Sequence, residues 1–147
     1  MRVLIIGTGY VGLNTGVVLS YIGHDVTCLD TNAEKIDLLR SGQTPFYEPH
    51  LDEMLAAVGP KMRFTTSYAE ADLSTVDVVF IAVGTPSLPD GNADLKYVHQ
   101  AVESIAQEMD GHFLVVVNKS TVPIGSGNWV GSLIKESYEK RVGAKAD

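Results

Sequence analysis

The chain has 147 residues, of which 45% are hydrophobic and 20% charged, and a formal net charge of −7 at pH 7. These values predict one globular domain and argue against binding to nucleic acid or to an anionic membrane, which needs clustered basic residues. The one cysteine, Cys28, rules out a disulfide within the chain and favours a reducing, cytoplasmic setting; we expect no signal peptide and no membrane span.

Strands and helices are predicted to alternate from the amino terminus onward. Residues 3–7, VLIIG, form a short apolar run that predicts a strand buried on both of its faces. Residues 10–22 predict a helix, since Val11, Val18, Leu19 and Ile22 fall on one apolar stripe. Gly23 is expected to end that helix, because glycine readily adopts the conformation that terminates a helix.

A second strand is predicted over residues 25–30 and ends at Asp30. Asn32 is the expected N-cap of a helix that runs through Leu39. A loop with two prolines and two aromatic residues follows over residues 42–49. Residues 51–58 then predict a short amphipathic helix, and residues 63–67 a third strand.

The second half of the chain continues this alternation. Residues 76–84, VDVVFIAVG, are the most apolar run and predict a central buried strand, with room for a short helix before it. A polar loop over 85–94 leads into a helix over 95–109, a fifth strand over 113–120 and a last helix over 125–141. The tail, RVGAKAD, has the composition of a frayed or cut end.

The order of these elements predicts the fold class. Strands that alternate with helices favour a parallel sheet with right-handed crossover connections. We therefore expect an α/β domain over residues 1–147, with a Rossmann-type, doubly wound parallel sheet in a three-layer α/β/α arrangement.

Residues 7–12, GTGYVG, match the pattern G-x-G-x-x-G, and they lie directly between a predicted strand and a predicted helix. Gly7 would permit the tight turn, Gly9 would let the backbone approach a pyrophosphate, and Gly12 would let the helix pack closely on the strand. Unpaired N–H groups at the start of the helix would face the phosphates. A tight turn that binds no ligand is the alternative interpretation.

Asp30 follows the glycine motif near the spacing of about 20 residues at which a ribose-binding carboxylate is expected. Its carboxylate can accept both ribose hydroxyls of an adenosine, and its charge would repel a 2′-phosphate. Together with the motif, Asp30 predicts a dinucleotide site that takes NAD rather than NADP. Lys35, on the next helix, could reach the adenosine, although a solvated lysine is the simpler interpretation.

Polar segments also follow the fourth and fifth strands, whose carboxyl ends share one edge of the predicted sheet. These segments are Gly84-Thr85-Pro86 and Lys119-Ser120-Thr121. The first combines a residue that allows close approach with a hydroxyl, and the second lies where the nicotinamide half of a dinucleotide is expected. Turn formation explains the first segment equally well, whereas capping of the last helix would explain only one hydroxyl of the second.

Nucleophilic and metal chemistry are both disfavoured. Cys28 lies inside the second strand between Thr27 and Leu29, which predicts a buried and inert thiol. The histidines form no i, i+4 pair and have no cysteine partner, so no metal site is expected; they are His24, His50, His99 and His112. Residues 89–94, PDGNAD, lack the glutamate spacing of a calcium loop and predict a turn.

Four stretches in order give the chain a resemblance far more specific than the glycine motif alone. They are MRVLIIGTGYVGL at 1–13, PFYEPHL at 45–51, VFIAVGTPSLPDGNADLKYV at 79–98 and NKSTVPIG at 118–125. Together they resemble the amino-terminal domain of the UDP-glucose/GDP-mannose dehydrogenase family, from Met1 to about Gly131. The resemblance implies oxidation of the 6-hydroxymethyl group of a nucleotide sugar to a carboxylate, with two NAD and a cysteine thioester.

The resemblance also implies roles for individual residues. Val11, Asp30, Lys35, Thr85 and Thr121 match positions that contact NAD, which favours a cofactor role for Lys35. Thr121 further matches a threonine that positions catalytic water, and Glu48 matches a loop glutamate near the cofactor. With the motif residues, the predicted cofactor site comprises Gly7, Gly9, Tyr10, Val11, Gly12, Asp30, Lys35, Gly84, Thr85, Pro86, Ser120 and Thr121.

Family members are about three times as long, so the resemblance implies a truncated, inactive domain. A central helical dimerisation domain and a sugar-nucleotide domain with the catalytic cysteine would lie beyond Asp147, as would the sixth strand of a complete fold. UDP-glucose would bind only with those domains, in a homodimeric parent enzyme that serves polysaccharide biosynthesis. A GDP-mannose or UDP-N-acetyl-mannosamine dehydrogenase and a stand-alone NAD sensor are alternatives.

Overall fold

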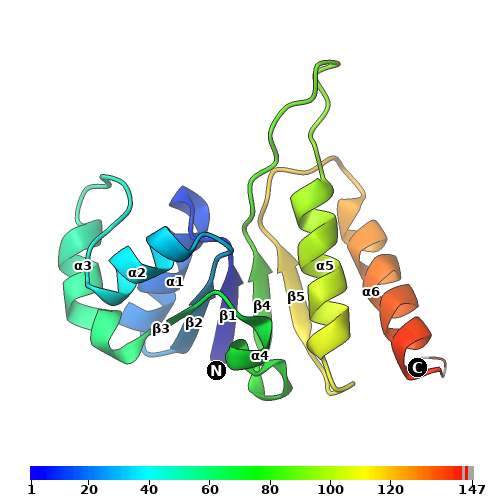
Figure 1. Cartoon of the computed structure of the whole chain (residues 1–147), viewed down its shortest axis with the longest axis horizontal. Helices are drawn as coiled ribbons and strands as arrows, with labels where there is room; N and C mark the ends of the chain where they lie inside the picture. Colours follow the sequence, from blue (N-terminus) through cyan, green and yellow to red (C-terminus); the bar gives the residue numbers. More distant parts are fainter. Residues whose placement is uncertain (144, 146–147) are drawn as a thin grey trace.

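The computed structural model describes residues 1–143 and 145, and shows a five-stranded parallel sheet with helices packed on it (Figure 1). The elements are β1 (Arg2–Ile6), α1 (Tyr10–Tyr21), β2 (Asp25–Leu29), α2 (Ala33–Arg40), α3 (Leu51–Val58), η1 (Gly59–Lys61), β3 (Arg63–Thr65), α4 (Tyr68–Ala71), η2 (Leu73–Thr75), β4 (Val78–Ile81), α5 (Lys96–Glu108), β5 (Val115–Asn118) and α6 (Ser126–Val142). The predicted α/β class and parallel sheet are confirmed.

The strand order β3-β2-β1-β4-β5 creates a switch point between β1 and β4. The chain first builds outward from β1 to β3, then crosses back to place β4 on the other side of β1. The loops after β1 and β4 therefore leave the sheet in opposite directions at its carboxyl edge. Such a divergence opens the crevice in which ligands of open α/β sheets bind.

Two apolar clusters fill the two sides of the sheet and make the expected three layers. One contains residues of α1, α2 and α3 against alternate β1 positions such as Val3 and Ile5. The other contains residues of α4, α5 and α6 against Leu4 and Ile6. All four of these β1 side chains are at most 2% exposed, which confirms a strand buried on both faces.

The apolar stripe predicted for α1 is wrong about which face is buried. Val11, Val18 and Ile22 are 49%, 47% and 63% exposed, while Leu19 is half-buried. The buried face instead consists of Gly12, Leu13, Gly16, Val17 and Ser20. Glycine is needed at position 16 of this face because the helix lies very close to the sheet there: a Cβ at Gly16 would lie 2.8 Å from Cys28 Sγ.

The fourth and fifth strands are shorter than the apolar runs that predicted them. The strand β4 ends at Ile81 instead of residue 84, although Ala82 N–H still donates to the Ile6 carbonyl at 2.8 Å, and β5 covers only 115–118 of the predicted 113–120. The Ile81 carbonyl accepts from the N–H groups of both Lys119 and Ser120, at 2.8 and 3.1 Å, where β5 ends. The apolar residues after Ile81, Ala82 and Val83, line the crevice, which explains their composition beyond the end of the strand.

The carboxyl-terminal part of the described chain consists of the edge strand β5 and the last helix, α6. β5 lies at one edge of the sheet, and Val115 and Phe113 beside it are 41% and 86% exposed. The last helix, α6, continues to Val142 and is capped by Gly143 at φ +70°. The predicted fraying concerns residues 141–147, of which 144, 146 and 147 lie outside the described residues. Within the described part of the chain, every helix is too short or too polar to cross a membrane.

Candidate functional site

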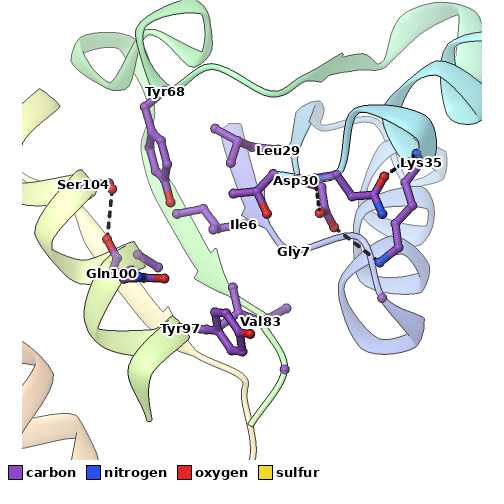
Figure 2. A pocket seen from close by; sticks show the side chains of 16 residues that line it. Ile6, Gly7, Leu29, Asp30, Lys35, Tyr68, Val83, Tyr97, Gln100 and Ser104 are labelled. Carbon is purple, nitrogen blue, oxygen red and sulfur yellow. Dashed lines mark hydrogen bonds and ion pairs between the residues drawn. The ribbon is translucent and has the colours of Figure 1, made fainter. Parts of the chain in front are cut away.

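A cavity of about 530 Å³ opens at the carboxyl ends of β1, β2 and β4 (Figure 2). Five of the predicted cofactor residues line it, namely Gly7, Gly9, Asp30, Lys35 and Gly84. One wall is formed by the glycine turn and the end of β2, and the opposite wall by α5 (Figure 2). The cavity therefore lies at the switch point of the sheet, where the order of the strands reverses.

The three motif glycines meet different physical demands. Gly7 has φ +99°, and a Cβ there would lie 2.6 Å from the Ala82 carbonyl oxygen. At Gly12 a Cβ would lie 1.9 Å from the Gly7 oxygen, so these two glycines allow backbone segments to touch. Gly9, the N-cap of α1, has open space where its Cβ would point. Only Gly9 thus keeps space free for something outside the fold.

Asp30, directly after β2, is held in place by hydrogen bonds from the glycine turn that follows β1. Its Oδ2 accepts from the Thr8 backbone N–H at 2.8 Å and from the Thr8 hydroxyl at 2.7 Å, and its Oδ1 accepts from Asn32 N–H at 3.0 Å. Lys35 Nζ lies 3.8 Å from Oδ2. Burial alone would raise the pKa of Asp30, but these donors outweigh it and lower the pKa below its ordinary value. The carboxylate is therefore ionised near neutral pH.

The wall opposite Asp30 comes from residues that the sequence prediction missed. Tyr68 of α4 and Tyr97, Gln100, Ala101 and Ser104 of α5 line the cavity. Figure 2 shows Tyr68, Gln100 and Ser104 across from Asp30. The positions on α5 fall three and four residues apart, which places them on one helix face. That spacing was a readable signal, but nothing local indicates that this face meets the end of β2. Aromatic rings with polar groups beside them suit a flat heterocyclic base.

A second cavity, of about 250 Å³, continues from the first toward β5. The two share Gly9, Ala82, Val83 and Gly84 as lining residues, so they form one continuous crevice. The predicted residues Tyr10, Val11, Thr85, Ser120 and Thr121 line the second cavity, together with Lys119. The Ser120 hydroxyl donates to the Val83 carbonyl at 2.8 Å, which ties the loop after β5 to the loop after β4.

Three predicted residues line neither cavity. Gly12 is buried beneath the turn, where its role is close packing. Pro86 is exposed beyond the crevice, and its carbonyl accepts from Asp94 N–H at 2.8 Å at the base of the loop that projects from the sheet (Figure 1). Glu48 lies in the loop before α3, which contacts the glycine turn where the rings of Tyr10 and Phe46 are 4.1 Å apart.

His112 and the PDGNAD segment, both considered above for metal binding, make local hydrogen bonds. No group of three or more His, Cys, Asp or Glu side chains that could hold a metal ion occurs among the described residues. His112 instead bridges the Val76 carbonyl, at 2.8 Å, and Asp110, at 2.6 Å, in the segment before β5. These two hydrogen bonds raise the pKa of His112 and tie this segment to the start of β4. The PDGNAD segment forms a turn in which Asp90 accepts from Asn92.

Cys28 is expected to be chemically inert in the folded chain. It is completely buried, and burial raises the pKa of its thiol to about 12, so almost no nucleophilic thiolate forms at pH 8. Native chain treated with a disulfide reagent such as Ellman's reagent at pH 8 should release almost no thiol signal. The same chain in guanidinium should release one equivalent. Fast reaction of the native chain would contradict the buried position.

Comparison with known proteins assigns the chain that forms this crevice to a family. The sequence matches, over residues 1–147, the family model described as UDP-glucose/GDP-mannose dehydrogenase family, NAD binding domain. UDP-glucose 6-dehydrogenase YwqF of Bacillus subtilis is 47% identical over 144 residues, which are 97% of this chain and 32% of that protein. The chain thus spans about a third of the length of the curated relatives it matches.

Solved structures agree with the sequence match. A UDP-glucose dehydrogenase from the hyperthermophilic archaeon Pyrobaculum islandicum is similar with a TM-score of 0.86 and 36% identity, covering 98% of this chain and 34% of that one. A GDP-mannose dehydrogenase from Pseudomonas aeruginosa gives a TM-score of 0.85 and 35% identity, covering 99% and 33%. Both are similar over nearly the whole of this chain and about a third of their own.

Proposed function

The chain belongs to the UDP-glucose/GDP-mannose dehydrogenase family and is its NAD-binding domain, and we propose that it is the cofactor domain of a UDP-glucose 6-dehydrogenase. That enzyme would oxidise UDP-glucose to UDP-glucuronate with two NAD. The observation that carries the proposal is the continuous crevice over the switch point, with the ionised Asp30 at one end and the hydroxyls of Ser120 and Thr121 at the other.

The residues that line the crevice fit the parts of NAD in order. Asp30 and Lys35 suit the adenosine ribose, and the α5 wall suits the adenine. Gly9 and the unpaired N–H groups of the first turn of α1 suit the pyrophosphate, because a helix start attracts anions. Val11, Thr85 and the loop after β5 then flank the nicotinamide half, with Pro86 just outside the crevice, and bound NAD supplies the hydride acceptor.

Thr121 is proposed to position water for the second half of the reaction. Its side chain is exposed at the open end of the second cavity, where a substrate-bearing domain could close over it. The parent is proposed to be a cytoplasmic homodimer that serves polysaccharide biosynthesis, with further domains that hold the sugar nucleotide and the catalytic cysteine. The length of the relatives and the exposed edge at β5 support such additional domains.

Two alternative functions are separated from this proposal by experiment. The structural similarity to a GDP-mannose dehydrogenase is nearly as high as that to a UDP-glucose dehydrogenase, so this domain alone does not select the sugar. Assay of the parent with UDP-glucose, GDP-mannose and UDP-N-acetyl-mannosamine separates these substrates. A stand-alone NAD sensor is the other; it requires a gene that stops at codon 147 and fails if the frame continues into a cysteine-bearing domain.

The 147-residue chain itself is expected to bind NAD but to oxidise no UDP-glucose. Hydride transfer needs a substrate held against the nicotinamide ring, and the residues that would hold it lie outside this chain. NADH formation followed at 340 nm with UDP-glucose and NAD should stay at the background of a heat-denatured sample. The full-length parent is the positive control, and measurable turnover by the short chain would contradict the proposal.

A further inference from the structure

Thr8 is a polar residue at an unusual place, since it is completely buried yet absent from the lining of either cavity. It occupies the second position of the glycine motif, between Gly7 and Gly9. Both of its donors, the backbone N–H and the hydroxyl, go to the same oxygen, Asp30 Oδ2, at 2.8 and 2.7 Å. Thr8 therefore cannot touch a ligand in the crevice and acts only through Asp30.

The two hydrogen bonds from Thr8 determine which lone pairs of the Asp30 carboxylate remain available to a ligand. A carboxylate oxygen has about two lone-pair positions, and Thr8 occupies both at Oδ2. Oδ1 accepts one hydrogen bond, from Asn32 N–H at 3.0 Å, and keeps one position open. A β-branched threonine also holds its hydroxyl in few rotamers, so the carboxylate is fixed in rotation. Asp30 thus presents a single, oriented acceptor to the cavity, where the sequence analysis expected it to accept both ribose hydroxyls.

We propose that Thr8 is a positioning residue for NAD selection: its hydroxyl locks the Asp30 carboxylate so that Oδ1 receives a hydroxyl of the adenosine ribose. The inference rests on the proposed NAD site and adds a residue that determines its specificity. Without the hydroxyl, the carboxylate can rotate and binds the ribose less well. The negative charge of the carboxylate is then no longer held in one position near the 2′ oxygen, so discrimination against a 2′-phosphate weakens.

The hydrogen bonds from Thr8 to Asp30 also affect the pH dependence of NAD binding. Binding of the ribose hydroxyl needs the ionised carboxylate, so NAD affinity is lost as the pH falls through the pKa of Asp30. Burial of Asp30 opposes ionisation, whereas Asn32, Thr8 and Lys35 favour it and lower its pKa overall. Removal of the Thr8 hydroxyl takes away one of these stabilising donors. The acid limit of NAD binding should therefore move to higher pH.

The test is calorimetric titration of the 147-residue chain with NAD and with NADP between pH 4.5 and 8. Thr8→Val keeps the shape of the side chain and removes the hydroxyl; we expect about tenfold weaker NAD binding at pH 7 and little change for NADP. Thr8→Ser keeps the hydroxyl and should stay within about threefold of the original chain. Should Thr8→Val not fold, Thr8→Ala removes the same hydroxyl and carries the same expectation.

A double-mutant cycle shows whether Thr8 acts through Asp30. In an Asp30→Ala background, Thr8→Val should cause no further loss of NAD affinity, and it should shift the acid limit only when Asp30 is present. Equal losses in both backgrounds, or Thr8→Val binding NAD as tightly as the original chain, would overturn the role of Thr8. If the original chain itself bound no NAD, the proposed function would fail instead.

Discussion

Asp30→Ala is expected to weaken NAD binding by about 100-fold and to abolish the preference for NAD over NADP. The substitution removes the acceptor for the ribose, and hydrogen bonds to charged groups contribute roughly 1.5–3 kcal/mol each. It also removes the negative charge that would meet a 2′-phosphate. NADP binding should therefore stay constant or improve slightly while NAD binding falls. Calorimetric titration of both nucleotides measures the two effects in one experiment.

A matched control for Asp30→Ala is available on α2. Asp37→Ala removes the same charge from an exposed side chain, which is 72% accessible. Its ion pair with Arg40, at 3.5 Å, is also exposed to solvent. This variant should bind NAD as tightly as the original chain, because exposed ion pairs contribute little and Asp37 does not line the crevice. If wild-type chain preferred NADP, or if the two alanine variants behaved alike, Asp30 would not be the ribose ligand.

The same carboxylate links folding to pH in a defined direction. Its pKa in the folded chain is below the ordinary value, so ionisation of Asp30 favours the folded state. This contribution is present above the pKa of the unfolded chain and is lost as the pH falls through the lower folded pKa. Asp30→Ala should therefore lose less stability than the original chain between neutral and strongly acid pH.

Local patterns were enough to predict the part of the site that lies close in sequence. The apolar run of β1, the glycines after it and Asp30 at the end of β2 all belong to one β-α-β unit. Within such a unit, a short apolar run is compatible with few structures other than a buried parallel strand, and the turn that follows it must be tight. The structure accordingly brings Gly7, Gly9 and Asp30 to one cavity.

The parts that sequence reasoning missed depend on contacts between distant elements. Tyr97 and Gln100 join the site only because the crossover places α5 beside the end of β4, which no local pattern states. The buried face of α1 was misassigned for a related reason. Periodicity finds large apolar residues such as Val18, whereas close approach to the sheet selects small ones such as Gly16.

The glycine motif should separate cleanly into one binding residue and two folding residues. Gly12→Ala puts a Cβ 1.9 Å from the Gly7 carbonyl oxygen and 3.2 Å from the Cβ of Ala82, and neither the backbone nor this short side chain has room to relax. We expect a loss of about 3 kcal/mol or more in the free energy of unfolding, which is a large share of the 5–15 kcal/mol typical of a domain. The variant should unfold at much lower denaturant concentration or fail to fold.

Gly9→Ala should have the opposite profile. Gly9 has φ −75° and ψ −172°, which alanine adopts without strain, and no atom lies within 4 Å of the added Cβ. Stability should fall by only about 1 kcal/mol, since alanine is a poorer N-cap than glycine but creates no clash here. NAD affinity should fall by about 30-fold or more, because the new methyl group occupies space that the pyrophosphate needs. Denaturant unfolding and calorimetry on both variants test the contrast, and unimpaired NAD binding by Gly9→Ala would show that the phosphates do not lie against α1.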